Sequence, residues 1–141
     1  MGDSGRKDAV HGMVSTSARV LLLGGSAVRV AYGAGALLAP ARMVSAEYAP
    51  DTYGLADPRL LLRAFGGHQL VTGCLTLASI RSRPLARAAA TLSLLIDTFD
   101  VASAILEQRA RGQRDQTIAG GYVISGAGMI AFAGALCALD R

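Results

Sequence analysis

Residues 117–139 read TIAGGYVISGAGMIAFAGALCAL, a segment without a single charged side chain. As an α-helix this segment crosses about 30 Å of hydrocarbon, because each residue adds about 1.5 Å of rise. The whole chain has a similar character: 52% of its residues are hydrophobic and 17% are charged, whereas a soluble domain usually carries about 25% charged residues. The sequence therefore predicts a protein embedded in a membrane.

Three further apolar segments precede this one, at residues 17–39, 60–80 and 85–106. The first ends at Pro40, where a helix normally stops. Residues 81–84, between the second and the third, are too few for anything but a tight helical hairpin. We therefore expect an all-α fold, a bundle of four transmembrane helices.

The remaining segments are polar. Residues 1–16 mix charged, glycine and small polar residues without periodicity, which is typical of a flexible or interfacial tail, and the helical domain then covers residues 17–141. Residues 41–59 form the one long connection, an acidic loop. Basic residues are almost evenly divided between the two sides of such a bundle, and the tail and first hairpin favour an N-in, C-in orientation. We expect the membrane to be the bacterial plasma (inner) membrane.

Composition argues against several kinds of site. The net charge of +4 comes with three Phe, four Tyr and no Trp, which leaves few stacking partners for nucleic acid. Cys74 and Cys137 lie inside apolar segments without metal-ligand spacing, and we expect them to be small core residues. The chain has two histidines, and one of them, His11, lies in the tail. The predicted bundle therefore lacks the pair of histidines that would bind haem between helices. We therefore expect no metal, no cofactor and no nucleic-acid partner.

Five ionisable residues lie within the predicted spans, where an unpaired charge costs about 2.5–3.5 kcal/mol on insertion scales. Arg29 and Asp97 both lie near the middle of their spans, Asp97 roughly 2 Å from it. Arg63 and Asp100 lie roughly 10 Å and 7 Å from the middle of theirs, toward the same membrane face. We predict two buried pairs, Arg29 with Asp97 and Arg63 with Asp100. The fifth residue, His68, is predicted to be a hydrogen-bonded polar residue between helices, near Gln69, Thr72 and Thr76.

Asp97 and Asp100 share one helical stripe with Ser93, Ala104 and Glu107, and we expect that stripe to face the bundle. An Arg at the matching depth favours fixed ion pairs over titrating groups. The alternatives left open are a site for a polar ligand or lipid headgroup, and catalysis or proton transfer. The Asp-x-x-Asp spacing is similar to the metal-binding acids of membrane phospholipid synthases, but the second acidic cluster of those enzymes is missing here.

Small residues recur every four residues on two of the spans. They are Ala27, Ala31 and Gly35 in the first span, and Gly121 and Ser125 in the fourth. Small side chains let helix backbones approach closely inside a membrane. We therefore expect these residues to mark the faces on which helices pack.

Four short motifs in residues 19–106 also stand out together: Arg29 followed by Gly33, LLAP at 37–40, RAFGGHQLVTG at 63–73, and Asp97 with Asp100. With these motifs the chain resembles a domain-of-unknown-function family of small four-helix bacterial membrane proteins that is common in actinobacteria. That family often carries Arg-Asp where this chain has His68-Gln69.

The resemblance implies a membrane protein without enzymatic activity. Some proteins of this kind accompany larger assemblies, including mycobacterial lipid importers of the mammalian-cell-entry type. It therefore implies an accessory or stabilising subunit of a larger membrane complex that handles lipids. The alternative is a small transporter or lipid-binding protein that uses the intramembrane Arg and Asp residues around a polar cavity.

Overall fold

The computed structural model describes residues 14–43, 58–111 and 116–140, and every regular element in these ranges is an α-helix. The predicted tail lies almost entirely outside the described residues, as does most of the 41–59 connection. The all-α prediction is confirmed. The elements are α2 (Thr16–Leu38), α3 (Pro40–Met43), α4 (Pro58–Ser79), α5 (Arg83–Arg111) and α6 (Gln116–Leu139).

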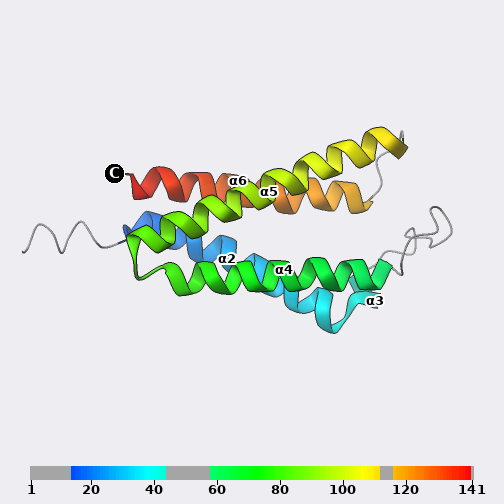
Figure 1. Ribbon diagram of the computed structural model, residues 1–141, viewed down its shortest axis with the longest axis horizontal. Helices are drawn as coiled ribbons and strands as arrows, with labels where there is room; N and C mark the ends of the chain where they lie inside the picture. Colours follow the sequence, from blue (N-terminus) through cyan, green and yellow to red (C-terminus); the bar gives the residue numbers. More distant parts are fainter. Residues whose placement is uncertain (1–13, 44–57, 112–115, 141) are drawn as a thin grey trace, which may run out of the picture.

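The four long helices alternate in direction, so that α2 begins and α6 ends at the same end of the bundle (Figure 1). Helix α2 packs against α4 and α6, and α5 packs against α6. The contact between α4 and α5 is less extensive, because α5 diverges from α4 toward its own C-terminal end (Figure 1). The bundle therefore consists of two close helix pairs, α2 with α4 and α5 with α6, joined mainly through α2 and α6.

Three segments are long and apolar enough to cross a membrane: Thr16–Leu38, Arg83–Ala110 and Tyr122–Leu139. Large apolar side chains cover the outside of these helices; Phe99 is 71% exposed and Ile130 is 77% exposed. Such a surface is suited to lipid rather than water. The predicted fourth span, α4, is long enough but is not among the three, because Arg63, His68 and Gln69 lower its mean hydropathy.

Helix boundaries follow local chemistry. Ser15 caps α2, where its hydroxyl accepts a hydrogen bond from the Ala18 backbone N–H at 3.3 Å. Pro40 ends α2 as predicted and then opens the short helix α3, which the sequence did not predict. Helix α5 continues through residues 107–111, which we expected to belong to a polar link. These residues are Glu, Gln, Arg and Ala, which all favour helix.

An apolar core fills the end of the bundle at which α2 begins and α6 ends. Phe132 of α6 is its largest fully buried side chain, and a Cβ atom at Gly25 would lie 2.9 Å from the Phe132 ring. Arg83 donates a hydrogen bond to the Leu139 carbonyl oxygen, which caps the end of α6. The core consists of Val14, Ala18, Leu22, Ala86, Ala90, Phe132, Ala135 and Leu139.

Helices α2 and α4 cross at a pair of glycines. A Cβ atom at Gly33 would lie 2.6 Å from the Gly66 carbonyl oxygen, and one at Gly66 would lie 2.5 Å from the Ala36 Cβ. Both distances are too short for real side chains, so the two backbones touch directly at this point. Close backbone approach of this kind replaces hydrophobic burial as the source of helix packing in a membrane.

The prediction that Ala27, Ala31 and Gly35 mark the face on which α2 packs against the other long helices is wrong. Ala27 and Ala31 are exposed, and Gly35 faces Met43 of the short helix α3, since a Cβ atom there would lie 3.1 Å from the Met43 sulfur. Burial of Arg29 explains this outcome, because residues two positions away from it lie on the opposite side of an α-helix. The buried face of α2 consists instead of Ala18, Leu22, Ser26, Arg29, Gly33 and Ala36.

Two further predictions concern other helices. Ser125 of α6 is 3% exposed, as expected of a packing residue, whereas the surroundings of Gly121 lie outside what the structure describes. Cys74 and Cys137 are both exposed, so their assignment to the core is wrong. In an apolar bundle a thiol is suited to the lipid-facing surface as well as to the core.

The glycine crossing is tested by substituting Gly66 with Ala. The new methyl group would meet Ala36 and the Gly33 carbonyl oxygen, and overpacking of this kind typically costs about 1–3 kcal/mol. Gly67→Ala is the matched control, since a Cβ atom there has nothing within 4 Å, and removal of a helical glycine stabilises by about 0.5–1 kcal/mol. Thermal unfolding in one detergent should place the two variants on opposite sides of the unmodified protein; equal melting temperatures would contradict the crossing.

Candidate functional site

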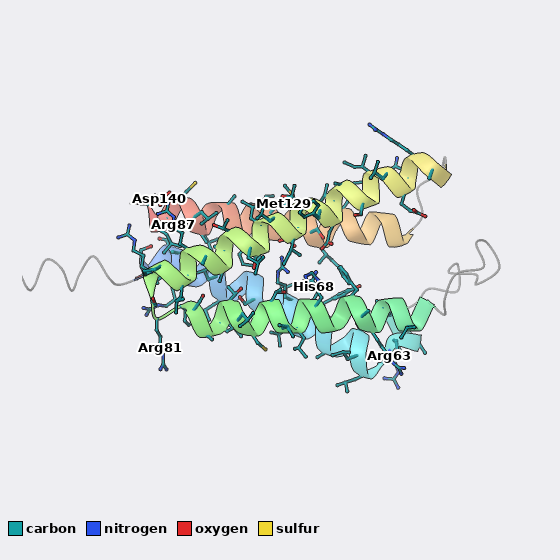
Figure 2. All side chains as sticks on the ribbon, viewed as in Figure 1. Arg63, His68, Arg81, Arg87, Met129 and Asp140 are labelled. Atoms are coloured by element: carbon teal, nitrogen blue, oxygen red, sulfur yellow. The ribbon has the colours of Figure 1, made fainter. Side chains whose placement is uncertain are left out.

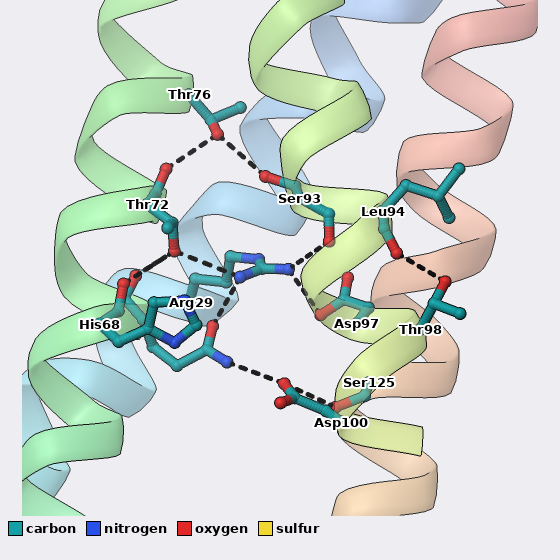
Figure 3. A network of polar contacts seen from close by, with 11 residues as sticks. Arg29, His68, Thr72, Thr76, Ser93, Leu94, Asp97, Thr98, Asp100 and Ser125 are labelled. Atoms are coloured by element: carbon teal, nitrogen blue, oxygen red, sulfur yellow. Dashed lines mark hydrogen bonds and ion pairs between the residues drawn. The ribbon is translucent and has the colours of Figure 1, made fainter. Parts of the chain in front are cut away.

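A buried arginine lies at the centre of the bundle. The side chain of Arg29 is 5% exposed, and its guanidinium donates hydrogen bonds to groups on two other helices (Figure 3). On α4 it donates to Gln69 Oε1 at 2.8 Å and to Thr72 Oγ1 at 3.2 Å. On α5 it donates to the Ser93 carbonyl oxygen at 3.0 Å and to Asp97 Oδ1 at 2.5 Å. The predicted pairing of Arg29 with Asp97 is confirmed.

Helix α6 completes the surroundings of this arginine. The Arg29 guanidinium carbon lies 5.1 Å from the centre of the Phe132 ring, a cation–π distance. Because Phe132 also belongs to the apolar core, the arginine joins the core to the polar middle of the bundle. One side chain of α2 therefore contacts all three other long helices.

Asp97 is held from two sides. Its Oδ1 atom accepts the Arg29 hydrogen bond, while Oδ2 is buried without a hydrogen-bond partner in the described part of the chain. A Cβ atom at Gly128 would collide with the Asp97 carboxylate. Glycine at this position of α6 therefore leaves the space that the carboxylate occupies.

A second group of hydroxyls continues the polar layer toward the α4–α5 turn. Thr76 Oγ1 lies 3.3 Å from Ser93 Oγ, which links α4 to α5, and it donates to the Thr72 carbonyl oxygen at 2.8 Å (Figure 3). Ser79 Oγ donates to the Thr76 carbonyl oxygen at 2.7 Å. These hydroxyls satisfy one another and the backbone, whereas the buried hydroxyl of Ser26 on α2 has no hydrogen-bond partner among the described residues.

Asp100 does not pair with Arg63, so the second predicted pair is wrong. Asp100 is half-buried, and its Oδ2 lies 3.4 Å from Gln69 Nε2 and 3.5 Å from Ser125 Oγ. Arg63 is exposed and points away from the bundle, on the side of α4 near α3 (Figure 2). Helical rise predicts depth but not direction around the axis, and Arg63 lies on a different face of α4 from Gln69.

His68 was predicted to be hydrogen-bonded between helices, but its ring has no hydrogen-bond partner among the described residues. Its side chain is exposed, and its ring centre lies 6.3 Å from that of Phe65. In Figure 2 it lies between α4 and α5, midway along the bundle. The hydrogen-bonded positions between helices belong to its neighbours Gln69, Thr72 and Thr76, which are 3%, 6% and 1% exposed.

The two principal acceptors on α4, Gln69 and Thr72, were not among the candidate site residues. Their spacing of three residues, with Thr76 four further on, places them on one helical face. A stripe of polar residues in an otherwise apolar helix marks a buried face in a membrane bundle. The stripe of Gln69, Thr72 and Thr76 therefore predicts the buried face of α4, whereas Arg63 lies on an exposed face.

The cluster of Arg29, His68, Asp97 and Asp100 has limited chemical capacity. In the ranges that the structure describes, no three His, Cys, Asp or Glu side chains are placed to hold a metal ion together. Arg29 has both terminal nitrogens committed to internal acceptors. Asp97 and Asp100 have weaker hydrogen bonding than Arg29, and Asp100 is the more accessible of the two acids.

The chain is thus an all-α protein with helices of membrane-spanning length and composition around a buried Arg–Asp pair. Comparisons with protein-family models, curated proteins and solved structures find no match to it. The resemblance to the actinobacterial family therefore stays a prediction.

The Arg29–Asp97 pair is tested by a double-mutant cycle. Arg29→Leu or Asp97→Leu alone leaves a buried charge without its partner, which costs about 3–5 kcal/mol. The double variant leaves no such charge and should recover most of the loss, because apolar replacement of a buried pair is often neutral or stabilising. Folded protein in the membrane and melting temperature in detergent are the measurements; additive losses without recovery would refute the pairing.

The matched control is the ion pair between Arg87 and Asp140, which are 2.7 Å apart at the end of the bundle (Figure 2). Both side chains are more than half exposed, and exposed pairs contribute only about 0–1 kcal/mol. Asp140→Leu should therefore leave the melting temperature almost unchanged under the same conditions.

Proposed function

We propose that this chain is a non-enzymatic integral membrane protein that serves as an accessory or stabilising subunit of a larger membrane complex. The observation that supports this best is the saturation of Arg29: both terminal nitrogens of its guanidinium are bonded to internal acceptors. Such an arginine holds helices together and has little capacity left for a substrate. A role in assembly is one that a bundle with many exposed apolar side chains can fulfil.

The outer surface supports the same proposal. Exposed large apolar side chains occur on all four long helices, including Val28 on α2, Val71 on α4, Phe99 on α5 and Ile130 on α6. This surface can contact lipid tails or apolar helices of other subunits. The resemblance to small actinobacterial membrane proteins adds the expectation that the complex transports lipids.

We further propose that all four long helices cross the membrane, with both termini on the cytoplasmic side of a bacterial plasma (inner) membrane. Helix α4 lies alongside α2, and its polar residues Gln69, Thr72 and Thr76 are buried. Part of its low hydropathy comes from these buried groups, which are turned away from lipid. The exposed Arg63 lies within two turns of the start of α4, where a long side chain reaches the membrane surface.

The membrane position of α4 is tested by cysteine labelling of intact cells, after Cys74 and Cys137 have been replaced with Ala. Ala41, at the start of the α2–α4 connection, is exposed, and Ser82 lies in the α4–α5 turn. A membrane-impermeant maleimide should modify Ala41→Cys in intact cells and Ser82→Cys only after permeabilisation. Labelling of both sites from one side would show that α4 does not cross; the reverse pattern would show the opposite orientation.

The accessory role is tested by purification of the tagged chain from native membranes in a mild detergent. We expect it to elute with a partner in fixed stoichiometry, and Asp97→Leu to reduce recovery of that partner along with the folded bundle. Asp140→Leu should leave recovery unchanged and serves as the control. Elution of the intact bundle alone, combined with no crosslink to another protein in native membranes, would contradict this role.

A small transporter or lipid-binding protein is the second candidate. The observation that favours it is the incomplete bonding of the two acids, since Asp97 Oδ2 has no partner in the described residues and Asp100 is half-buried. Vesicles containing the pure chain should then transport or retain a polar lipid, and Asp100→Asn should abolish this activity without loss of folded protein.

A further inference from the structure

Arg63 is a charged side chain on an otherwise apolar outer stripe of α4. The stripe follows spacings of three and four residues and consists of Leu60, Arg63, Gly67, Val71 and Cys74. The side chains of Leu60, Val71 and Cys74 are exposed, and a Cβ atom at Gly67 would have nothing within 4 Å. The stripe faces lipid when α4 crosses a membrane. An arginine on such a face needs an anion from outside the bundle.

The packing of α4 against α2 determines the level of Arg63 along the bundle. The two helices run in opposite directions (Figure 1), and a Cβ atom at Gly66 would lie 2.5 Å from the Ala36 Cβ. Three residues further toward this end of the bundle, Arg63 is level with Ala39, directly after the last residue of α2. The apolar span of α2 ends at Leu38. Arg63 therefore lies where the apolar surface ends, which is the level of the lipid headgroups.

The short helix α3 brings a second arginine to this level. Helix α3 follows α2 directly and packs against α4, and Arg63 lies on the side of α4 near α3 (Figure 2). A Cβ atom at Gly35 would lie 3.1 Å from the sulfur of Met43, eight residues later, so the chain turns back here and holds α3 against the end of α2. Arg42, the neighbour of Met43, is exposed.

The positive charges of Arg42 and Arg63 are not balanced within this part of the protein. The described residues of α2, α3 and α4 include no acidic residue. Neither arginine belongs to an ion pair in the ranges that the structure describes, where the pairs are Arg29 with Asp97 and Arg87 with Asp140. Two outward-facing cations thus lie at one level, on elements that touch, without an anion of their own.

We propose that Arg63 and Arg42 bind the phosphate group of an anionic phospholipid at this end of the α2–α4 pair. A guanidinium presents its N–H donors in one plane and binds a phosphate through two parallel hydrogen bonds. The acyl chains of the lipid then lie along the apolar stripe of α4. The inference rests on the membrane position of α4 proposed above, which cysteine labelling tests separately.

The surroundings favour a lipid over a free phosphate ion. Two exposed arginines bind a free ion weakly, whereas a bilayer holds headgroup phosphates at their level in high local concentration. Leu38 and Leu60, which are 86% and 60% exposed, offer apolar surface to the acyl chains beside the arginines. The N-terminal end of α4 adds partial positive charge, and its first turn contains no acidic residue.

The experiment measures the melting temperature of the full chain in dodecyl maltoside micelles into which phosphatidylglycerol is titrated. The melting temperature should rise and then saturate, because a ligand that binds the folded state stabilises it. Phosphatidylcholine, whose headgroup has no net charge, should give no comparable rise. Sodium phosphate at the same ionic strength should give none. Equal rises with both phospholipids, or with sodium phosphate and phosphatidylglycerol, would overturn the proposal.

Substitutions identify the residues that bind. Arg63→Gln and Arg42→Gln should each raise the phosphatidylglycerol concentration for half of the rise about tenfold, since each removes charge-assisted hydrogen bonds. Both side chains are exposed, so neither change removes an internal contact of the fold. Arg109→Gln is the matched control: it removes an exposed arginine near the C-terminal end of α5, at the same end of the bundle, and should leave the titration unchanged. Equal titrations for Arg63→Gln and Arg109→Gln would show unspecific charge attraction and overturn the proposal.

An acidic helix of another subunit is the competing occupant of this surface. Photo-leucine introduced in place of Leu60, one turn from Arg63 on the same stripe, should crosslink to phospholipid in native membranes. A crosslink to a protein that disappears in the Arg63→Gln variant would show that an acidic partner binds here, and would overturn the proposal. The titration in micelles uses the pure chain, so its outcome is independent of the accessory role, which purification from native membranes tests.

Discussion

The bundle depends on the burial of one positive charge, that of Arg29, in an otherwise apolar helix. A guanidinium can only donate hydrogen bonds and does not lose its charge in a protein, so its neighbours must supply acceptors and a negative charge. The acceptors come from two helices. Helix α4 supplies Gln69 and Thr72, while α5 supplies the Ser93 carbonyl oxygen and Asp97. This requirement brings three helices together at one level, in surroundings where apolar burial alone provides little attraction between helices.

The same requirement determines which faces of the helices are in contact. Once Arg29 faces inward, Ser26 and Gly33 must face inward with it, and Gly33 allows α4 to approach until the backbones touch at Gly66. On α6, Gly128 leaves room for the Asp97 carboxylate. These glycines do not act through conformational freedom; each is needed because a methyl group at its position would occupy the space of an atom of the facing helix.

Most of the architecture follows from the sequence, since the apolar segments and the breaks between them predict four long helices close to their actual limits. The Arg29–Asp97 pair also follows, because both residues lie at the centre of their segments. What periodicity and depth cannot predict is the rotation of a helix about its own axis. That rotation placed Arg63 outside and Gln69 inside, and it turned Ala27 and Ala31 outward although their spacing is typical of packing residues. For α2 the rotation follows from Arg29, because burial of this residue turns the opposite face of the helix away from the core.

The polar layer thereby separates into two parts with different capacities. At Arg29 both terminal nitrogens are bonded to internal acceptors, and removal of any of these acceptors would leave a buried donor unsatisfied. One turn further along α5, Asp100 has only long hydrogen bonds and partial exposure. The bonded arginine holds one arrangement of the helices, whereas the long hydrogen bonds of Asp100 hold its carboxylate less firmly. Gln69 joins the two parts, because its side-chain amide accepts a hydrogen bond from Arg29 and donates one, at 3.4 Å, to Asp100.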